Sequence, residues 1–143
     1  AIALTARAAY NEPYRAVRMR STAPRVPVEA PGRVSYEWRI GTRWQHVSAT
    51  AAGEAALPSP ASEAAFITEH FWGYTRQRDG GTVEYEVSHP RWRVWSGSDA
   101  SLAAAVPRLY GSSFARVLAG HPASALVAEG SAVTVFRPRR IGA

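Results

Sequence analysis

The 143-residue sequence contains neither lysine nor cysteine. Without lysine, it has no primary-amine side chain that can form a Schiff base with a carbonyl substrate. Without cysteine, it has no disulfide, zinc–thiolate site or thiol nucleophile. No apolar run approaches the roughly 20 residues that span a bilayer, and no signal-peptide pattern is present. These absences predict a cytoplasmic protein that makes no contact with a membrane.

All 17 basic residues are arginine, and against 11 carboxylates they give a net charge of +6. Guanidinium groups stay charged throughout the physiological pH range. Such a surface attracts phosphates, nucleic acid or acidic ligands. The arginines are spread from Arg7 to Arg140 without a dense run, however. We therefore favour a compositional bias that replaces lysine throughout.

The length suits a single domain with a core of its own. Hydrophobic residues make up 46% of the chain and charged residues 20%, which is typical of a globular protein rather than a disordered one. The sequence opens on Ala1, and its one methionine is Met19. We therefore expect residues 1–143 to form one domain that lacks an N-terminal portion.

Apolar residues alternate with polar ones along much of the chain, which predicts antiparallel strands. The clearest pair is Val34 to Ile40 and Arg43 to Thr50, joined at Gly41-Thr42. About eight short strands with two or three short helices predict a mainly β (α+β) fold, a barrel or a sandwich. The other expected elements are a helix at Ala1–Ala9, a strand at Arg15–Arg20, loops at Ala23–Gly32 and Ala51–Pro60, a helix at Glu63–Thr68 capped by Ser62, a hairpin of Phe71–Arg76 with Thr82–His89, a strand at Leu102–Val106, a helix from Pro107 to about Leu118, and a hairpin of Ala123–Ala128 with Ser131–Phe136.

Three segments together carry a family likeness: AIALTARAAYNEPYR at Ala1–Arg15, AFITEHFWGYTRQR at Ala65–Arg78 and VEYEVSHPRWRVW at Val83–Trp95. In order and spacing they resemble the uncharacterised bacterial branch of the acetoacetate decarboxylase-like superfamily. The likeness covers the C-terminal part of such proteins, which are typically longer, and nearly all of this chain. It implies an antiparallel β-barrel with two or three short flanking helices and an internal small-molecule pocket.

The sequence departs from that family at the catalytic position. In acetoacetate decarboxylases, the segment resembling Ala1–Arg15 ends in a proline followed by lysines, one of which forms the Schiff base. Here Pro13 is followed by Tyr14 and Arg15. The resemblance therefore implies the fold without the decarboxylase mechanism. The family's acidic and arginine pocket residues would lie before Ala1.

Four residues are candidates for ligand binding: Tyr14, Arg15, Tyr74 and Trp92. By resemblance, Arg15 would lie at the pocket wall and bind a carboxylate through its planar guanidinium, while Tyr14 donates a hydrogen bond. The alternative for this pair is a strand start with a surface arginine and a packed tyrosine. The alternative for Trp92 is a place in the core.

Two residues are candidates for catalysis, His89 and Glu69. An imidazole serves as general acid or base near neutral pH, and Pro90 restricts the chain after His89. The alternative is that His89 ends a strand and bonds a neighbouring loop. Glu69 acts as a base in one interpretation and fixes the corner between a helix and a strand in the other. The sequence leaves open whether the chain is an enzyme.

We expect no metal and no cofactor. The histidines at 46, 70, 89 and 121 lack paired ligand spacing. A Gly-x-Ser-x-Gly nucleophile motif and a glycine-rich phosphate loop are both absent.

The leading hypothesis is a domain that binds a small carboxylated or aromatic molecule. The alternatives are a non-catalytic scaffold and a basic binder of single-stranded nucleic acid. We do not expect nucleic acid, although arginines and aromatic residues alternate in two segments in the way that stacking platforms require. These residues are Trp72, Tyr74, Arg76, Arg91, Arg93 and Trp95. The identity of the ligand and the oligomeric state are left open.

Overall fold

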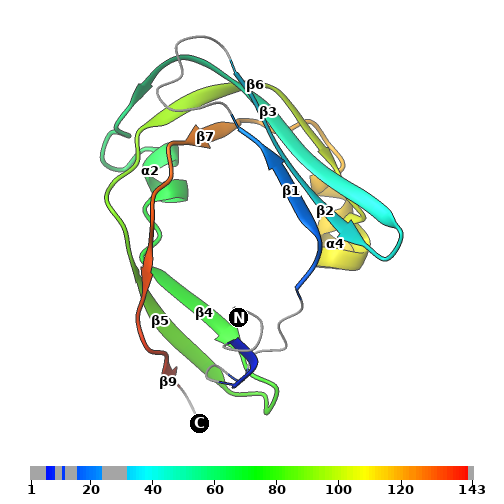
Figure 1. Ribbon diagram of the computed structural model, residues 1–143, viewed down its shortest axis with the longest axis vertical. Helices are drawn as coiled ribbons and strands as arrows, with labels where there is room; N and C mark the ends of the chain where they lie inside the picture. The colour runs from blue at the N-terminus through cyan, green and yellow to red at the C-terminus, as the bar shows by residue number, and fades with distance from the viewer. Residues whose placement is uncertain (1–5, 9–10, 12–15, 24–31, 142–143) are drawn as a thin grey trace. The chain divides into compact units, whose positions relative to one another are not determined.

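The computed structural model describes residues 6–8, 11, 16–23 and 32–141. It is mainly β, with antiparallel sheets and a few short helices (Figure 1). Residues 6–8 are helical. The other elements are β1 (Met19–Thr22), β2 (Gly32–Ile40), β3 (Arg43–Ala56), α2 (Glu63–Thr68), β4 (Trp72–Arg76), β5 (Thr82–Ser88), β6 (Val94–Ala103), α3 (Val106–Tyr110), α4 (Ser112–Leu118), β7 (Leu126–Ala128), β8 (Thr134–Val135) and β9 (Arg139–Ile141).

The described chain divides into two compact units. Unit 1 is built around Ser59–Trp92 and the segment that starts at Gly130, and unit 2 is built from Val17–Pro58 and Arg93–Glu129. Each unit contains one sheet. None of the helices in the described part of the chain has the length and apolar character that crossing a bilayer requires.

Unit 2 contains a five-stranded antiparallel sheet with the order β1-β2-β3-β6-β7. The β2–β3 hairpin turns at Gly41 and Thr42, with Ile40 opposite Arg43. Gly41 has φ +60, a conformation that glycine adopts without a steric penalty from Cβ. The hairpin fixes the register of β2 against residues 43–51 of β3.

The sheet of unit 2 curls because the pairing of β3 with β6 slips twice. Ser48 faces Ser101 but Thr50 faces Ser98, so β6 has one extra residue between these pairs. Asp99 lies in that interval with φ 49. A second shift falls between Ala52 and Ala56. Each bulge bends its strand and increases the local twist, so the sheet forms a half-barrel.

The core of unit 2 is small and contains one large side chain. Trp95 is 5% exposed and packs with Ala51 and Ala55 of β3, with Val127 of β7 beside them. The guanidinium of Arg93 donates to the backbone oxygen of Ala55 through Nε and Nη2. Alanines on β3 leave the room that the indole fills.

Unit 1 is organised around β5, which pairs with β4 on one edge and with β8 and β9 on the other. Val83 and Glu84 of β5 are buried. The Glu84 carboxylate accepts two hydrogen bonds from the guanidinium of Arg139 in β9, so the buried charge is paired. Helix α2 begins at Ser62, whose hydroxyl accepts from the backbone N–H of Ala65.

Several local predictions are confirmed. The β2–β3 hairpin, the β4–β5 hairpin and the Ser62-capped helix lie where the sequence places them. The strand predicted at 15–20 appears later, as β1, and only residues 6–8 of the predicted first helix are described. The loop predicted at 23–32 lies almost entirely outside the described residues, and Gly32 already belongs to β2.

Other local predictions are wrong. The loop predicted at 51–60 is strand as far as Ala56, because these alanines pack against a tryptophan. The helix predicted from Pro107 is broken at Gly111, which has φ +82. The strand predicted at 102–106 is the end of β6, which starts at Val94.

The predicted last hairpin is also wrong. Strand β7 pairs with β6 in unit 2, whereas β8 pairs with β5 in unit 1. The turn at Glu129-Gly130 therefore leads from one unit to the other instead of joining paired strands. The cross-strand partners of both segments lie far away in the sequence, and local alternation does not specify them.

Substitution of Gly73 by alanine is expected to destabilise unit 1. Gly73 pairs with Tyr85, and a Cβ at this position would overlap the Tyr85 ring. The ring must therefore move, at a cost of about 1–3 kcal/mol in the free energy of unfolding. Urea denaturation of the Gly73→Ala variant measures this. Gly120→Ala, where a Cβ meets nothing nearer than 3.5 Å, is the matched control and should change stability little.

The carboxylate of Asp79 is expected to stabilise unit 1 at neutral pH and not in acid. A hydrogen bond from the backbone N–H of Gly81, followed by one from Arg140, lowers the pKa of Asp79 in the folded state. A lowered folded pKa stabilises the protein above the unfolded value of about 3.9, and this contribution disappears as pH falls through the folded pKa. Asp79→Asn should therefore destabilise the protein at neutral pH, and the difference from wild type should shrink in acid. Unfolding curves at several pH values measure it, and a difference independent of pH would contradict the assignment.

Candidate functional site

The sequence-predicted site residues fall in different parts of the chain. Tyr14 and Arg15 lie outside the described residues. Glu69, His89 and Trp92 lie in unit 1, close to the end of α2 and the end of β5. Tyr74 lies on β4 and is 62% exposed. The structure therefore brings three of the six candidates into one region.

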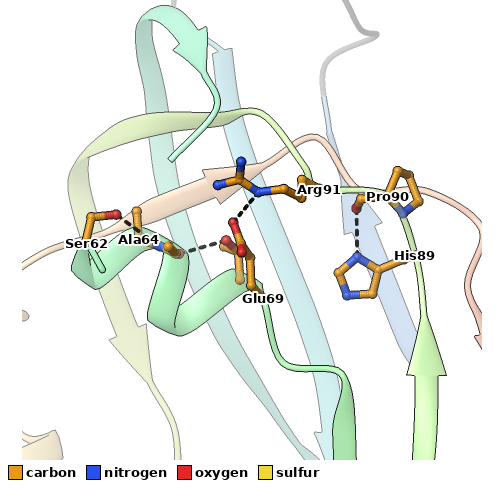
Figure 2. A network of polar contacts seen from close by, with 8 residues as sticks. Ser62, Ala64, Glu69, His89, Pro90 and Arg91 are labelled. Atoms are coloured by element: carbon orange, nitrogen blue, oxygen red, sulfur yellow. Dashed lines mark hydrogen bonds and ion pairs between the residues drawn. The ribbon is translucent and has the colours of Figure 1, made fainter. Parts of the chain in front are cut away.

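His89 is held by aromatic and backbone contacts within unit 1. Its ring stacks on the indole of Trp92, with centroids 4.0 Å apart and an interplanar angle of 14°, and lies 4.9 Å from the ring of Phe71. Nδ1 lies 2.8 Å from the carbonyl oxygen of Pro90, as Figure 2 shows. Because a carbonyl only accepts, Nδ1 donates and the neutral ring presents Nε2 as its acceptor. The indole N–H of Trp92 in turn donates to the hydroxyl of Ser131.

Glu69 is engaged in an ion pair at the end of helix α2. Its Oε1 lies 2.6 Å from Nε of Arg91, and Figure 2 shows these two side chains directed toward each other. Its backbone N–H donates to the carbonyl of Ala65 in the last turn of the helix. The carboxylate thus ties the segment after β5 to the corner that follows α2. This arrangement matches the structural role considered for Glu69 more closely than the catalytic one.

The proposed arginine–aromatic platform is not formed along 91–95. Trp95 is 5% exposed and belongs to the core of unit 2, so its face is not available to a nucleic-acid base. Arg93 uses two donors on the backbone oxygen of Ala55. The expectation of a shared exposed face there is wrong, because β6 buries both Val94 and Trp95.

A cavity of unit 2 lies on its sheet and has a volume of about 440 Å³. Four strands, helix α4 and the segment before β7 contribute to its wall. Most of the lining is apolar, and the hydroxyl-bearing residues are Tyr36 and three serines. The lining residues are Val34, Tyr36, Val47, Ser48, Ala49, Ala100, Ser101, Leu102, Leu118, Gly120, Pro122, Ser124, Ala125 and Leu126.

Strand register explains why these residues meet. Tyr36 is opposite Val47, and Val47 is opposite Leu102, so the three side chains form a row across β2, β3 and β6. Paired residues in an antiparallel sheet share a face. Val34 and Ala49 form the next row. The β6 bulge follows at this level of the sheet, so the bend that curls the sheet also shapes the cavity.

The same sheet carries a polar surface formed by residues of the opposite register. Arg20 binds Glu37 through two hydrogen bonds of 2.6 and 2.9 Å and lies 4.3 Å from the ring centre of Trp44. The hydrogen bond from Arg20 lowers the pKa of Glu37. Arg33 donates to the hydroxyl of the buried residue Ser48. These charges face solvent or each other, which leaves the alternate positions of β2 and β3 for the apolar cavity.

The residues that line this cavity were not predicted from the sequence. The alternation of Val34 and Tyr36 was visible, but alternate apolar residues are usual for a strand packed on a core. The structure leaves Tyr36, Val47 and Leu102 partly exposed, at 47%, 39% and 42%. A sequence does not show that such a row stays partly exposed, because the exposure depends on the segment that packs opposite the sheet, here α4 and the residues before β7.

The contacts of His89 are expected to stabilise the fold. His89→Ala removes a ring packed between Phe71 and Trp92 and should lower the free energy of unfolding by about 1 kcal/mol. His89→Phe keeps the stacking surface and should remain closer to wild type. Chemical denaturation of the three proteins measures this. Equal stability of wild type and His89→Ala would show that the ring contacts contribute nothing to folding.

A comparison with known protein families finds one that matches most of the chain. The model of the DUF2071 family, described as an uncharacterized conserved protein, matches residues 1–132. The chain therefore belongs to the DUF2071 family. No curated protein and no solved structure matches it.

Proposed function

We propose that this member of the DUF2071 family binds a small carboxylated or aromatic molecule in the cavity of unit 2. The observation that carries the proposal is an apolar cavity of about 440 Å³ on a sheet face. Small-molecule sites are typically concave, mostly apolar and about 300–1,000 Å³ in volume. The cavity falls within that range.

The row formed by Tyr36, Val47 and Leu102 supplies apolar surface that a ligand would bury. Covering such surface contributes about 25 cal/mol per Å². The flat ring of Tyr36 suits an aromatic partner, since offset or edge-on ring pairs add about 0.5–1.5 kcal/mol beyond the area they bury. The wall therefore favours a ligand with a hydrocarbon or aromatic body.

Polar groups at the wall give the ligand an orientation. The hydroxyl-bearing residues Tyr36 and Ser124 are lining residues, and a hydroxyl can donate one hydrogen bond and accept others. A few polar groups in an apolar wall are the usual means by which a pocket selects among ligands of similar size. Hydroxyl donors are compatible with a carboxylate oxygen.

We also propose that the chain is related in fold to the acetoacetate decarboxylase-like superfamily. We propose further that it is a single-domain, cytoplasmic protein. The three resembling segments and the mainly β, antiparallel fold support the relationship. The chemistry differs, because the chain has no lysine to form a Schiff base.

Binding of the neutral fluorescent probe N-phenyl-1-naphthylamine tests the proposal. The wild-type protein should bind the probe saturably with an increase in emission. Ala49→Phe adds a ring to the cavity wall and should weaken binding by roughly 50-fold, the loss expected when about 100 Å² of apolar contact is displaced.

Ala103→Phe is the matched control. Ala103 follows Leu102 on β6, pairs with His46 on the other face of the sheet and is exposed. The same added ring should leave probe affinity unchanged there. If Ala49→Phe is folded by circular dichroism and binds the probe as wild type does, the cavity is not the binding site. Absence of saturable binding to wild type would also overturn the proposal.

A further inference from the structure

A second cavity of unit 2 is lined by arginines. It has a volume of about 430 Å³ and lies where the β2–β3 turn meets the start of α3. Arg43 and Arg108 both line it, one from the first position of β3 and the other from α3. The remaining lining residues are Ile40, Gly41, Thr42, Gln45 and Ala105. The wall therefore contains two cations and no carboxylate.

Neither guanidinium is neutralised within the described part of the chain. The ion pairs of that part include those of Arg20, Arg91, Arg139 and Arg140. Guanidinium groups do not lose their proton at neutral pH, so both residues contribute positive charge to the wall of this cavity. An oxyanion bound there would offset that charge and accept several donors in the planar geometry that arginine provides.

Gln45 adds a fixed amide to the same wall. Its side chain is 5% exposed, and its Oε1 accepts the backbone N–H of Ala105 just before α3. That bond fixes the orientation of the amide, with Nε2 as its donor end. Nε2 donates to the carbonyl oxygen of Arg43 over 3.5 Å, which is the outer limit for a hydrogen bond. An amide nitrogen has two hydrogens, so at least one donor remains for a ligand.

We infer that Arg43, Arg108 and Gln45 form a binding site for a small oxyanion, a carboxylate or a phosphate group. Gln45 holds the segment before α3 against β3, which places Arg108 at the same cavity as Arg43. Two guanidiniums and a neutral amide donor supply charge and hydrogen bonds, while the wall offers no competing acid. The site is distinct from the apolar cavity and does not depend on a ligand there.

The anion has two possible sources. Arg43, Gln45 and Val47 occupy alternate positions of β3 and so share a face, and Val47 lines the apolar cavity. Two residues of a strand span about 7 Å, so an amphipathic carboxylate can reach from one cavity to the other. That source rests on the proposed function, whereas a free inorganic oxyanion does not.

Titration with inorganic phosphate, acetate and octanoate tests the inference. In low-salt buffer, phosphate should cause saturable shifts of the Gln45 side-chain amide signals in nitrogen-15 NMR spectra. Arg43→Gln and Arg108→Gln should each weaken phosphate binding by roughly 10-fold, the loss that accompanies one charge-assisted hydrogen bond. Octanoate binding more tightly than acetate would assign an amphipathic ligand, and equal affinities would assign a free anion.

Arg116→Gln is the matched control, because it removes the same charge from an exposed position of α4 outside the wall of this cavity. Its phosphate affinity should equal that of wild type. Equal weakening in all three variants would reduce the effect to general attraction by a basic surface and overturn the site. Absence of saturable binding by any of the three anions would also overturn it. If the wild-type protein binds phosphate but does not bind N-phenyl-1-naphthylamine, only the proposed function is rejected.

Discussion

The pairing of β3 along both of its edges is the constraint on which unit 2 depends. Its 14 residues join β2 on one side and β6 on the other. One face of its first half carries Gln45, Val47 and Ala49, which contribute to two different cavities. The second half is alanine-rich and accommodates Trp95. A single strand therefore sets the register of the sheet, receives the core tryptophan and places the walls of both candidate sites.

The curvature of the unit 2 sheet determines the shape of the apolar cavity. An extra residue at Asp99 and a second register shift near Gly53 interrupt the ladder between β3 and β6. Neither residue needs to touch a ligand to influence binding. The irregular backbone at these positions bends the strands. It thereby influences the direction in which the side chains of Tyr36, Val47 and Leu102 point.

Local features of the fold were predictable from the sequence, whereas long-range pairing was not. Alternation marked β2, and Ser62 marked the start of α2, because each signal depends on neighbours within a few residues. The sequence predicted a strand only at the end of β6, because Ser96, Gly97 and Ser98 in its middle lack apolar alternation. Its pairing on both edges stabilises it instead. The separation of β7 from β8 also depends on distant partners.

The site was harder to predict than the fold. Chemical reactivity directed attention to His89 and Glu69, yet the structure engages the first in aromatic stacking and the second in an ion pair. The cavity walls consist mainly of residues with no distinctive chemistry, such as Ala49, Ala100 and Leu102. Their importance comes from register and curvature, which a linear pattern does not encode. Arg43 and Arg108 could not be distinguished from the other arginines in the sequence, because only the folded chain brings them to one cavity.

The chain order of unit 1 has a consequence for its assembly during synthesis. Strand β5 is completed at Ser88, but its partner β9 begins at Arg139. The carboxylate of Glu84 and its arginine partner are separated by 55 residues, and the second segment of unit 2, Arg93–Glu129, is translated between them. While the ribosome makes that stretch, one edge of β5 lacks its partner and Glu84 lacks its counter-charge. The nascent chain thus carries an open strand edge, which invites pairing with other chains, until β9 emerges from the exit tunnel.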